Sequence, residues 1–330
     1  MPHHLHHIFF TPPSKPKFMT IGIPKALLYY KYHAFATAFF EALGARVVVS
    51  PDTNRQILDT GALLCADEAC LPVKVMHGHA AWLRGRCDAL LVPRFMRMAK
   101  GKSICPMFCG LPDMLRAALP DLPPLIDAPV WSLDEPERWA LLAAHGLAGK
   151  SAIIRAVQTG LAAQRALPLN PETEDVRYRV ALIGHAYVLG DRFVNMGLMK
   201  KLKRLGVGVV TEEQVEEANI TRAAARLFKA PFWYFARRYY GAAAYLAASG
   251  QVDGVLYVSA FSCGVDSVTA ELVAGAADGL PFMVLKIDEH TGEAGLDTRL
   301  EAFADMLEGR NHGHHVPANG QHYAGCQVVL

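Results

Sequence analysis

Seven cysteines give this 330-residue chain its clearest capacity for chemistry, because a thiolate can bind a metal ion or exchange electrons. Two of them lie in the segment SICPMFCGLP (residues 103–112), whose prolines and glycine predict a turn at the edge of the fold. Cys87 precedes an apolar run, and we interpret it as a small core residue. The remaining six are the candidates for chemistry: Cys65, Cys70, Cys105, Cys109, Cys263 and Cys326.

The expected compartment bears on what these thiols do. The first 17 residues lack the basic start and long apolar run of a signal peptide, so we expect a cytoplasmic protein. A reducing compartment disfavours disulfides and favours metal or redox roles. No stretch of about 18 apolar residues predicts a membrane span. A net charge of +2 gives no electrostatic reason to expect nucleic acid as a partner.

The spacing of the cysteines leaves two kinds of metal site open. Structural zinc sites usually use close cysteine pairs, which Cys65 with Cys70 and Cys105 with Cys109 match only loosely. Cys263 comes from a distant segment. Thiolates gathered from separate loops suit an iron–sulfur cluster, so spacing alone favours iron–sulfur but retains zinc.

The order of the expected elements predicts an α/β fold. Apolar strands alternate with helices in both halves of the chain, which indicates two open parallel sheets of the flavodoxin or Rossmann kind with helical insertions. Because sites in such sheets lie beyond the carboxyl ends of the strands, we expect the cluster between the two lobes. The expected organisation is a disordered tail (1–17), an N-terminal α/β lobe (18–125), a helical connector (126–176), a C-terminal α/β lobe (177–310) with a helical insert at about 215–249, and a second tail (311–330).

Nucleotide-binding signatures are missing from the sequence. It contains no GxxxxGK[ST] phosphate loop, and the glycines of residues 206–208 precede a predicted strand instead of following one. The aspartate–glycine loops with which another class of ATPase binds phosphate are also absent. This chain is therefore not expected to hydrolyse ATP.

Five segments resemble those of a known family: CADEACLPVKVMHGH (65–79), SICPMFCGLPDM (103–114), GHAYVLGDRFVN (184–195), SAFSCGVDS (259–267) and LKIDEHTGEAGLDTRLEAFADML (285–307). Together they look like the acyl-CoA dehydratase activase-related proteins. These are relatives of the D-component of 2-hydroxyglutaryl-CoA dehydratase and of benzoyl-CoA reductase subunits. The resemblance extends from about Met19 to Leu307, in the same order and with similar spacing.

The resemblance implies an oxygen-sensitive 4Fe-4S cluster in a protein of an anaerobe. By motif match its ligands are Cys70, Cys105 and Cys263, and we choose Cys65, five residues before Cys70, as the fourth. In catalytic members of the wider superfamily, one iron lacks a cysteine and meets the substrate.

A larger cluster is the alternative that the resemblance leaves open. Some related proteins carry a double-cubane 8Fe-9S cluster held by six cysteines. Here that cluster would add Cys109 and Cys326, which fall outside the family pattern. We therefore favour one cubane over two.

Polar residues near these segments have two interpretations. Glu289 and His290 follow a predicted strand and are candidates for proton donors or acceptors beside the cluster. Alternatively, the segment forms a turn network in which Thr291 and Glu293 satisfy free helix amides. The sequence does not decide between the two.

Other residues are candidates to tune the cluster. Lys74 could lower the pKa of a thiol, or could simply be solvated. His77 and His79 lie in one helix and point in different directions, so both cannot face one site. We expect Lys74, His77 and His290 to set the cluster's potential.

The resemblance implies low-potential electron transfer from an ATP-hydrolysing activase to a bound small substrate, with an acyl-CoA as one possibility. One alternative is an enzyme that itself dehydrates a 2-hydroxyacyl-CoA or reduces a small unsaturated molecule. Another is a metal-stabilised scaffold without redox activity. Relatives pair two such subunits, so a homodimer is conceivable, and PFWYFARRYYG (231–241) is either a partner face or a buried helix.

Overall fold

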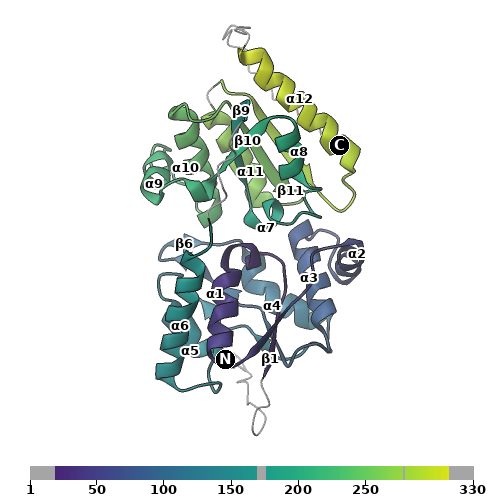
Figure 1. The fold of residues 1–330 in the computed structure, drawn as a ribbon, viewed down its shortest axis with the longest axis vertical. Helices are drawn as coiled ribbons and strands as arrows, with labels where there is room; N and C mark the ends of the chain where they lie inside the picture. The colour runs from purple at the N-terminus through teal and green to yellow at the C-terminus, as the bar shows by residue number, and fades with distance from the viewer. Residues whose placement is uncertain (1–18, 169–175, 278, 312–330) are drawn as a thin grey trace, which may run out of the picture.

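The computed structural model describes residues 19–168, 176–277 and 279–311. It has two α/β lobes, one above the other in Figure 1, with the earlier part of the chain in the lower lobe. Each lobe contains an open four-stranded sheet whose pairings are all parallel. The predicted α/β class with two open parallel sheets is therefore confirmed.

The N-terminal lobe is built on the sheet β2-β1-β3-β7. Gly22 in β1 leaves room for Cys87, since a Cβ there would lie 2.6 Å from the Cys87 sulfur, so Cys87 serves packing. The strands are β1 (Thr20–Ile23), β2 (Arg46–Val49), β3 (Ala89–Leu91) and β7 (Leu125–Ile126), with the short strands β4 (Arg94–Phe95), β5 (Arg97–Ala99), β6 (Lys102–Ser103) and β8 (Pro129–Val130). Its helices are α1 (Tyr29–Ala42), α2 (Arg55–Leu64), α3 (Leu71–Leu83), α4 (Pro106–Ala118), α5 (Pro136–Ala143) and α6 (Lys150–Arg165).

Helices α5 and α6 lie within the predicted connector and pack on this lobe. Trp139 of α5 contacts Phe35 and Phe39 of α1. Gln164 of α6 donates to the carbonyl of Lys31 at 2.7 Å. The connector is thus tied to α1, and both predicted tails (1–17 and all but the first residue of 311–330) lie outside the described residues.

The C-terminal lobe is built on the sheet β10-β9-β11-β12. All seven residues of the central strand β11 are buried, as expected for a parallel strand covered on both faces. The strands are β9 (Tyr178–Gly184), β10 (Val207–Thr211), β11 (Gly254–Ala260) and β12 (Phe282–Ile287). The helices are α7 (Ala186–Leu189), α8 (Leu198–Arg204), the 3-10 turn η1 (Glu212–Gln214), α9 (Glu217–Ala224), α10 (Tyr234–Ala248), α11 (Gly264–Ala276) and α12 (Glu293–Asn311).

The aromatic segment 231–241 leads into α10, which packs against α9 and α11. Tyr239 is fully buried, as are Ala242 and Leu246 further along the helix. Gly241 is required where α10 crosses α9, since a Cβ would lie 2.4 Å from the carbonyl oxygen of Ile220. The buried-helix interpretation of this segment therefore fits the fold.

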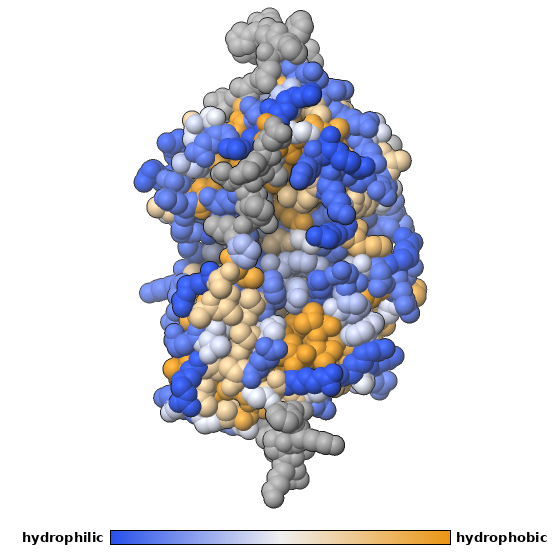
Figure 2. Space-filling view, in the orientation of Figure 1, coloured by the Kyte–Doolittle hydropathy of each residue, from blue (hydrophilic) through white to orange (hydrophobic). Residues whose placement is uncertain are grey.

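On the face seen in Figure 2, hydrophilic side chains are spread over both lobes around a smaller apolar area on the lower lobe. Among the helices that the structure describes, none is long and apolar enough to cross a membrane.

Candidate functional site

Three cysteines meet in one cavity between the lobes, which we call the cysteine cavity. Cys70, Cys105 and Cys263 all line it. Each is the residue immediately before a helix, namely α3, α4 and α11. Prolines in the first turns of α3 and α4 suit this geometry, because proline is preorganised for the first helical position and needs no amide partner there. Three helix N-termini therefore converge on one point.

Backbone amides of these helices point at the sulfur atoms. The Cys70 sulfur accepts a hydrogen bond from the amide of Val73, and the Cys263 sulfur accepts one from the amide of Asp266. Cys105 has the same arrangement with the amide of Met107. Because a helix N-terminus carries partial positive charge, this geometry favours anionic sulfur.

Burial opposes that charge while no cation is bound. It raises the pKa of Cys70 to about 11, and it also raises the pKa of Cys105. The pKa of Cys263 is raised well above its ordinary value, first by burial and second by the nearby Asp266. The thiols are therefore protonated at neutral pH, and a metal group that binds them must release these protons.

The rest of the cavity wall is largely aromatic. Among the described residues, no lysine or arginine lines it. The ring of His185 stacks on that of Tyr187, with centroids 4.6 Å apart. The aromatic lining residues are Phe108, Tyr187, Trp233, Tyr234 and Phe235. Such walls lower the local dielectric, which strengthens electrostatic interactions at the sulfurs.

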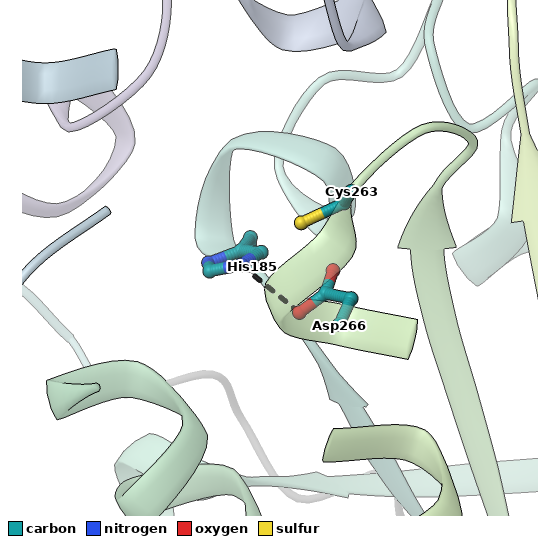
Figure 3. A group of neighbouring side chains, drawn as sticks. All are labelled: His185, Cys263 and Asp266. Carbon is teal, nitrogen blue, oxygen red and sulfur yellow. Dashed lines mark ion pairs between the residues drawn. The ribbon is translucent and has the colours of Figure 1, made fainter. Parts of the chain in front are cut away.

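Behind Cys263 lies a buried polar network that includes His185 and Asp266 (Figure 3). Each of the three residues offers one ligand atom, and these atoms lie within 4.8 Å of one another. His185 Nε2 lies 3.2 Å from Asp266 Oδ1, and the Tyr239 hydroxyl lies 2.9 Å from His185 Nδ1. Both ring nitrogens thus have protein partners, so His185 as placed is not a free ligand.

Asp266 keeps one oxygen without a partner. Its Oδ1 accepts a hydrogen bond from the Tyr257 hydroxyl at 3.0 Å. Its Oδ2 is buried, and no donor in the described part of the chain reaches it. Asp266 itself does not line the cysteine cavity. The carboxylate is therefore placed to act on the cavity through space, from behind Cys263 and His185.

Two residues with left-handed backbone occur at this site. Leu27, with φ 49°, lines the cavity, and Ser262, with φ 67°, directly precedes Cys263. This conformation is costly for residues with a Cβ and concentrates at functional sites. The turn at Ser262 positions Cys263 at the start of α11.

The other predicted ligands lie outside the cavity. Cys65 caps the C-terminus of α2, half-buried, close enough to Cys70 to contribute to its raised pKa. Cys109 lies one turn into α4 with its sulfur 3.4 Å from that of Met96. Cys326 is outside the described residues. A role for these three as ligands stays a prediction.

Glu289 and His290 do not line the cavity either. Glu289 forms an ion pair with Lys74 of the other lobe at 2.5 Å. His290 is exposed, and its amide donates to the carboxylate of Asp288, which also accepts from the Thr291 hydroxyl. The segment therefore forms a turn around Asp288. The Thr291 hydroxyl also accepts from the Asp288 amide and Glu293 pairs with Lys201, so these bonds differ from the predicted bonds to helix amides.

The two histidines of α3 have separate partners, as their spacing predicts. His77 Nδ1 lies 2.8 Å from the carbonyl oxygen of Val73. His79 lies between the hydroxyls of Ser50 (2.8 Å) and Thr53 (2.9 Å), and Thr53 in turn donates to Asp191 of the C-terminal lobe. Burial lowers the pKa of His79 to about 4, so this histidine is neutral and serves the contact between the lobes.

Sequence reasoning assigned no role to His185, Tyr187 or Asp266. All three stand in segments that carry the family resemblance, GHAYVLGDRFVN and SAFSCGVDS. His185 directly follows β9, so the rule that sites lie at strand ends could have found it. Asp266 gave no such signal, because an acidic residue in the first turn of a helix is commonly a dipole partner.

Comparisons with known proteins agree with the resemblance. Residues 20–215 match the family model described as the CoA enzyme activase uncharacterised domain. Residues 137–307 match the model of the 2-hydroxyglutaryl-CoA dehydratase D-component. A search of curated proteins finds no match. Since each model covers more than half of the chain, the protein belongs to the 2-hydroxyglutaryl-CoA dehydratase D-component family, and its residues 20–215 belong to the uncharacterised domain family named for CoA enzyme activases.

Proposed function

We propose that this protein binds a 4Fe-4S cluster in the cysteine cavity and uses it for low-potential electron transfer. The observation that carries the proposal is the convergence of Cys70, Cys105 and Cys263 at three helix N-termini. Cysteine thiolates are the usual ligands of such clusters. When bound, the cluster supplies one-electron chemistry.

The residues present fit this group. Backbone amides donate to all three sulfurs, as suits the anionic sulfur of a cluster. No lysine or arginine among the described residues lines the cavity, and the buried carboxylate of Asp266 adds negative charge nearby. Because a reduced cluster carries more negative charge, the lack of lysine and arginine and the presence of Asp266 favour a low reduction potential, and the amides at the helix N-termini oppose this effect in part.

The fourth ligand position has one candidate thiol. Cys65 lies outside the cavity yet close enough to Cys70 to affect its pKa. Cys65 is the fourth ligand in this proposal; if it does not bind, the fourth iron of the cluster has no cysteine ligand. A double cubane is disfavoured, because Cys109 directs its sulfur at Met96.

The electron source in this proposal is a separate ATP-hydrolysing activase. The family descriptions name a CoA enzyme activase and a CoA-ester dehydratase, and the sequence has no phosphate loop of its own. A small substrate, with an acyl-CoA as one possibility, would receive the electron. An oxygen-free, reducing cytoplasm is the setting that such chemistry requires.

Serine substitutions at the three cavity cysteines test the proposal. Cys70→Ser, Cys105→Ser and Cys263→Ser are each expected to lose most of the bound iron and its visible absorbance after anaerobic preparation. Cys87→Ala is the matched control, since Cys87 packs against β1, and it should retain its iron. Iron binding that survives all three serine variants would contradict the proposal.

A further inference from the structure

A second cavity, of about 90 Å³ and partly open to the surface, lies in the N-terminal lobe, and we call it the N-lobe cavity. It is formed where β1 and β3 end, at Ile23, Pro24 and Val92, and along one face of α1 that includes Tyr29 and Ala36. Ligand sites in open parallel sheets lie at this end of the strands. The cavity is therefore where the fold favours a ligand.

The N-lobe cavity adjoins the cysteine cavity. Leu27 and Phe108 line both of them, so these two side chains form the partition between the two spaces. Leu27 holds this position with a left-handed backbone, at φ 49°. A molecule in the N-lobe cavity would be one side chain away from the space that the three cysteines enclose.

The chemistry of the walls disfavours charged ligands. Most lining side chains are aliphatic or phenyl, and among the described residues no lysine or arginine lines the cavity. The polar groups of the wall are the hydroxyls of Tyr29 and Tyr32 and the ring of His33. Burial raises the pKa of Tyr29 and of Tyr32, so their hydroxyls stay neutral. Lys25 lies 6.0 Å from the ring centre of Tyr29, but its ammonium is paired with Asp52. A carboxylate or phosphate would lose hydration there and would find only two hydroxyls and one imidazole, with no lysine or arginine among the described lining residues to balance its charge.

The volume indicates how large the enclosed part of a ligand can be. A cavity of about 150 Å³ with similar apolar walls binds benzene or xenon. At about 90 Å³, the N-lobe cavity suits xenon or a molecule of a few heavy atoms. The nucleotide part of a CoA ester is too large to be enclosed there, and its charges would find no lysine or arginine among the described lining residues.

We propose that the N-lobe cavity binds a small, uncharged, largely apolar molecule next to the cysteine site. Binding follows from the cavity's walls and does not depend on the cluster. The role of this molecule as electron acceptor rests on the proposed function. On that function, the cavity specifies the group that accepts the electron as small and neutral, such as the acyl end of a larger molecule.

Xenon is the probe for the first test, by xenon NMR titration of the full chain. The wild-type protein is expected to give a saturable shift. Ala36→Leu fills the cavity from α1 and should abolish the saturable shift, whereas Ala38→Leu, on the same helix but lining neither cavity, should retain it. Leu111→Ala should enlarge the cavity and admit benzene, an effect that misfolding cannot imitate.

The second test separates neutral from charged ligands of the same shape. Propionamide is expected to displace xenon, and propionate is not. No saturable xenon binding in the wild type, equal binding by Ala36→Leu, or equal displacement by propionate would each overturn the proposal.

Iron content measured on the same samples separates this proposal from the proposed function. Saturable xenon binding without iron would support ligand binding in the N-lobe cavity and contradict the electron-transfer function. Iron at the three cysteines without xenon binding would support the proposed function and contradict ligand binding in the N-lobe cavity.

Discussion

Two regions between the lobes differ sharply in their chemistry. Outside the cysteine cavity, charged side chains are paired across the interface, and we call these ion pairs the rim. Glu212 of the C-terminal lobe accepts from Lys31 of α1 at 2.8 Å, and Lys74 of α3 pairs with Glu289. In the cysteine cavity, the described residues present thiols and aromatic rings but no lysine or arginine. The cations at the interface are thus neutralised by partners, which leaves the thiols without a compensating protein charge. The rim holds the lobes together, and the cavity is left for the chemistry.

Among the changes to these two regions, Glu212→Ala is expected to lower the free energy of unfolding most. Glu212 is buried, and the cations of Lys31 and Arg238 keep its pKa below its ordinary value although burial alone would raise it. Removing one partner of a buried ion pair costs about 3 to 5 kcal/mol. Glu213 and Glu217 also contact the two cations, so we expect the lower end, about 3 kcal/mol, in denaturant unfolding. An unchanged unfolding midpoint would show that the rim does not hold the lobes together.

The second-largest effect is expected from acidification, which should weaken the contact that His79 makes between the lobes through Thr53 and Asp191. The pKa of His79 falls from 6.5 to about 4 on folding, so between these values the unfolded chain binds more protons. Stability is therefore fully present above about pH 6.5 and declines as pH falls toward 4, by up to roughly 3 kcal/mol. Unfolding free energies of wild type and His79→Asn measured from pH 7 to 4 should converge. Parallel curves would contradict this assignment.

Asp266→Asn probes the cavity instead of the rim. Asp266 is the second cause, after burial, of the raised pKa of Cys263, so its removal should lower that pKa. One pKa unit would increase the alkylation rate of Cys263 about tenfold in cluster-free protein, because the thiolate is the nucleophile. Cys87, whose pKa does not depend on Asp266, is the internal control. In iron-loaded protein, the midpoint potential should also rise. Unchanged reactivity of Cys263 and an unchanged midpoint potential would show that Asp266 does not influence the cavity.

Lys74→Met should have the smallest effect. It removes the ion pair with Glu289, which is partly exposed, and we expect a loss of about 1 kcal/mol in thermal or denaturant unfolding. Lys74 does not line the cavity, although burial raises the pKa of Cys65 and the charge of Lys74 lowers it in part, so the midpoint potential should change less than in Asp266→Asn. A shift as large as that of Asp266→Asn would support the expectation from sequence that Lys74 tunes the cluster.

The sequence was informative where structure depends on local signals. Apolar runs and glycines predicted the two parallel sheets, and the segments around Cys70, Cys105 and Cys263 predicted the family. The ion pair of Lys74 with Glu289 joins residues 215 positions apart, so only the packing of the two lobes creates it. Lys74, His77 and His290 do not line the cavity, whereas His185 lines it and Asp266 lies behind it.

The N-lobe cavity was equally invisible in the sequence. Its walls are ordinary apolar residues of β1, α1 and α4, which read as core in any α/β lobe. A cavity arises from how such side chains fail to fill space, and this depends on their relative placement in three dimensions.

The most direct test of the central claim is a count of iron, acid-labile sulfide and zinc per chain in anaerobically purified protein. The account predicts about four irons and about four sulfides per chain, as one cubane requires, with no stoichiometric zinc. About eight irons would indicate the double cubane and bring Cys109 and Cys326 into the ligand set. Stoichiometric zinc without sulfide would contradict the account and leave a metal-stabilised scaffold.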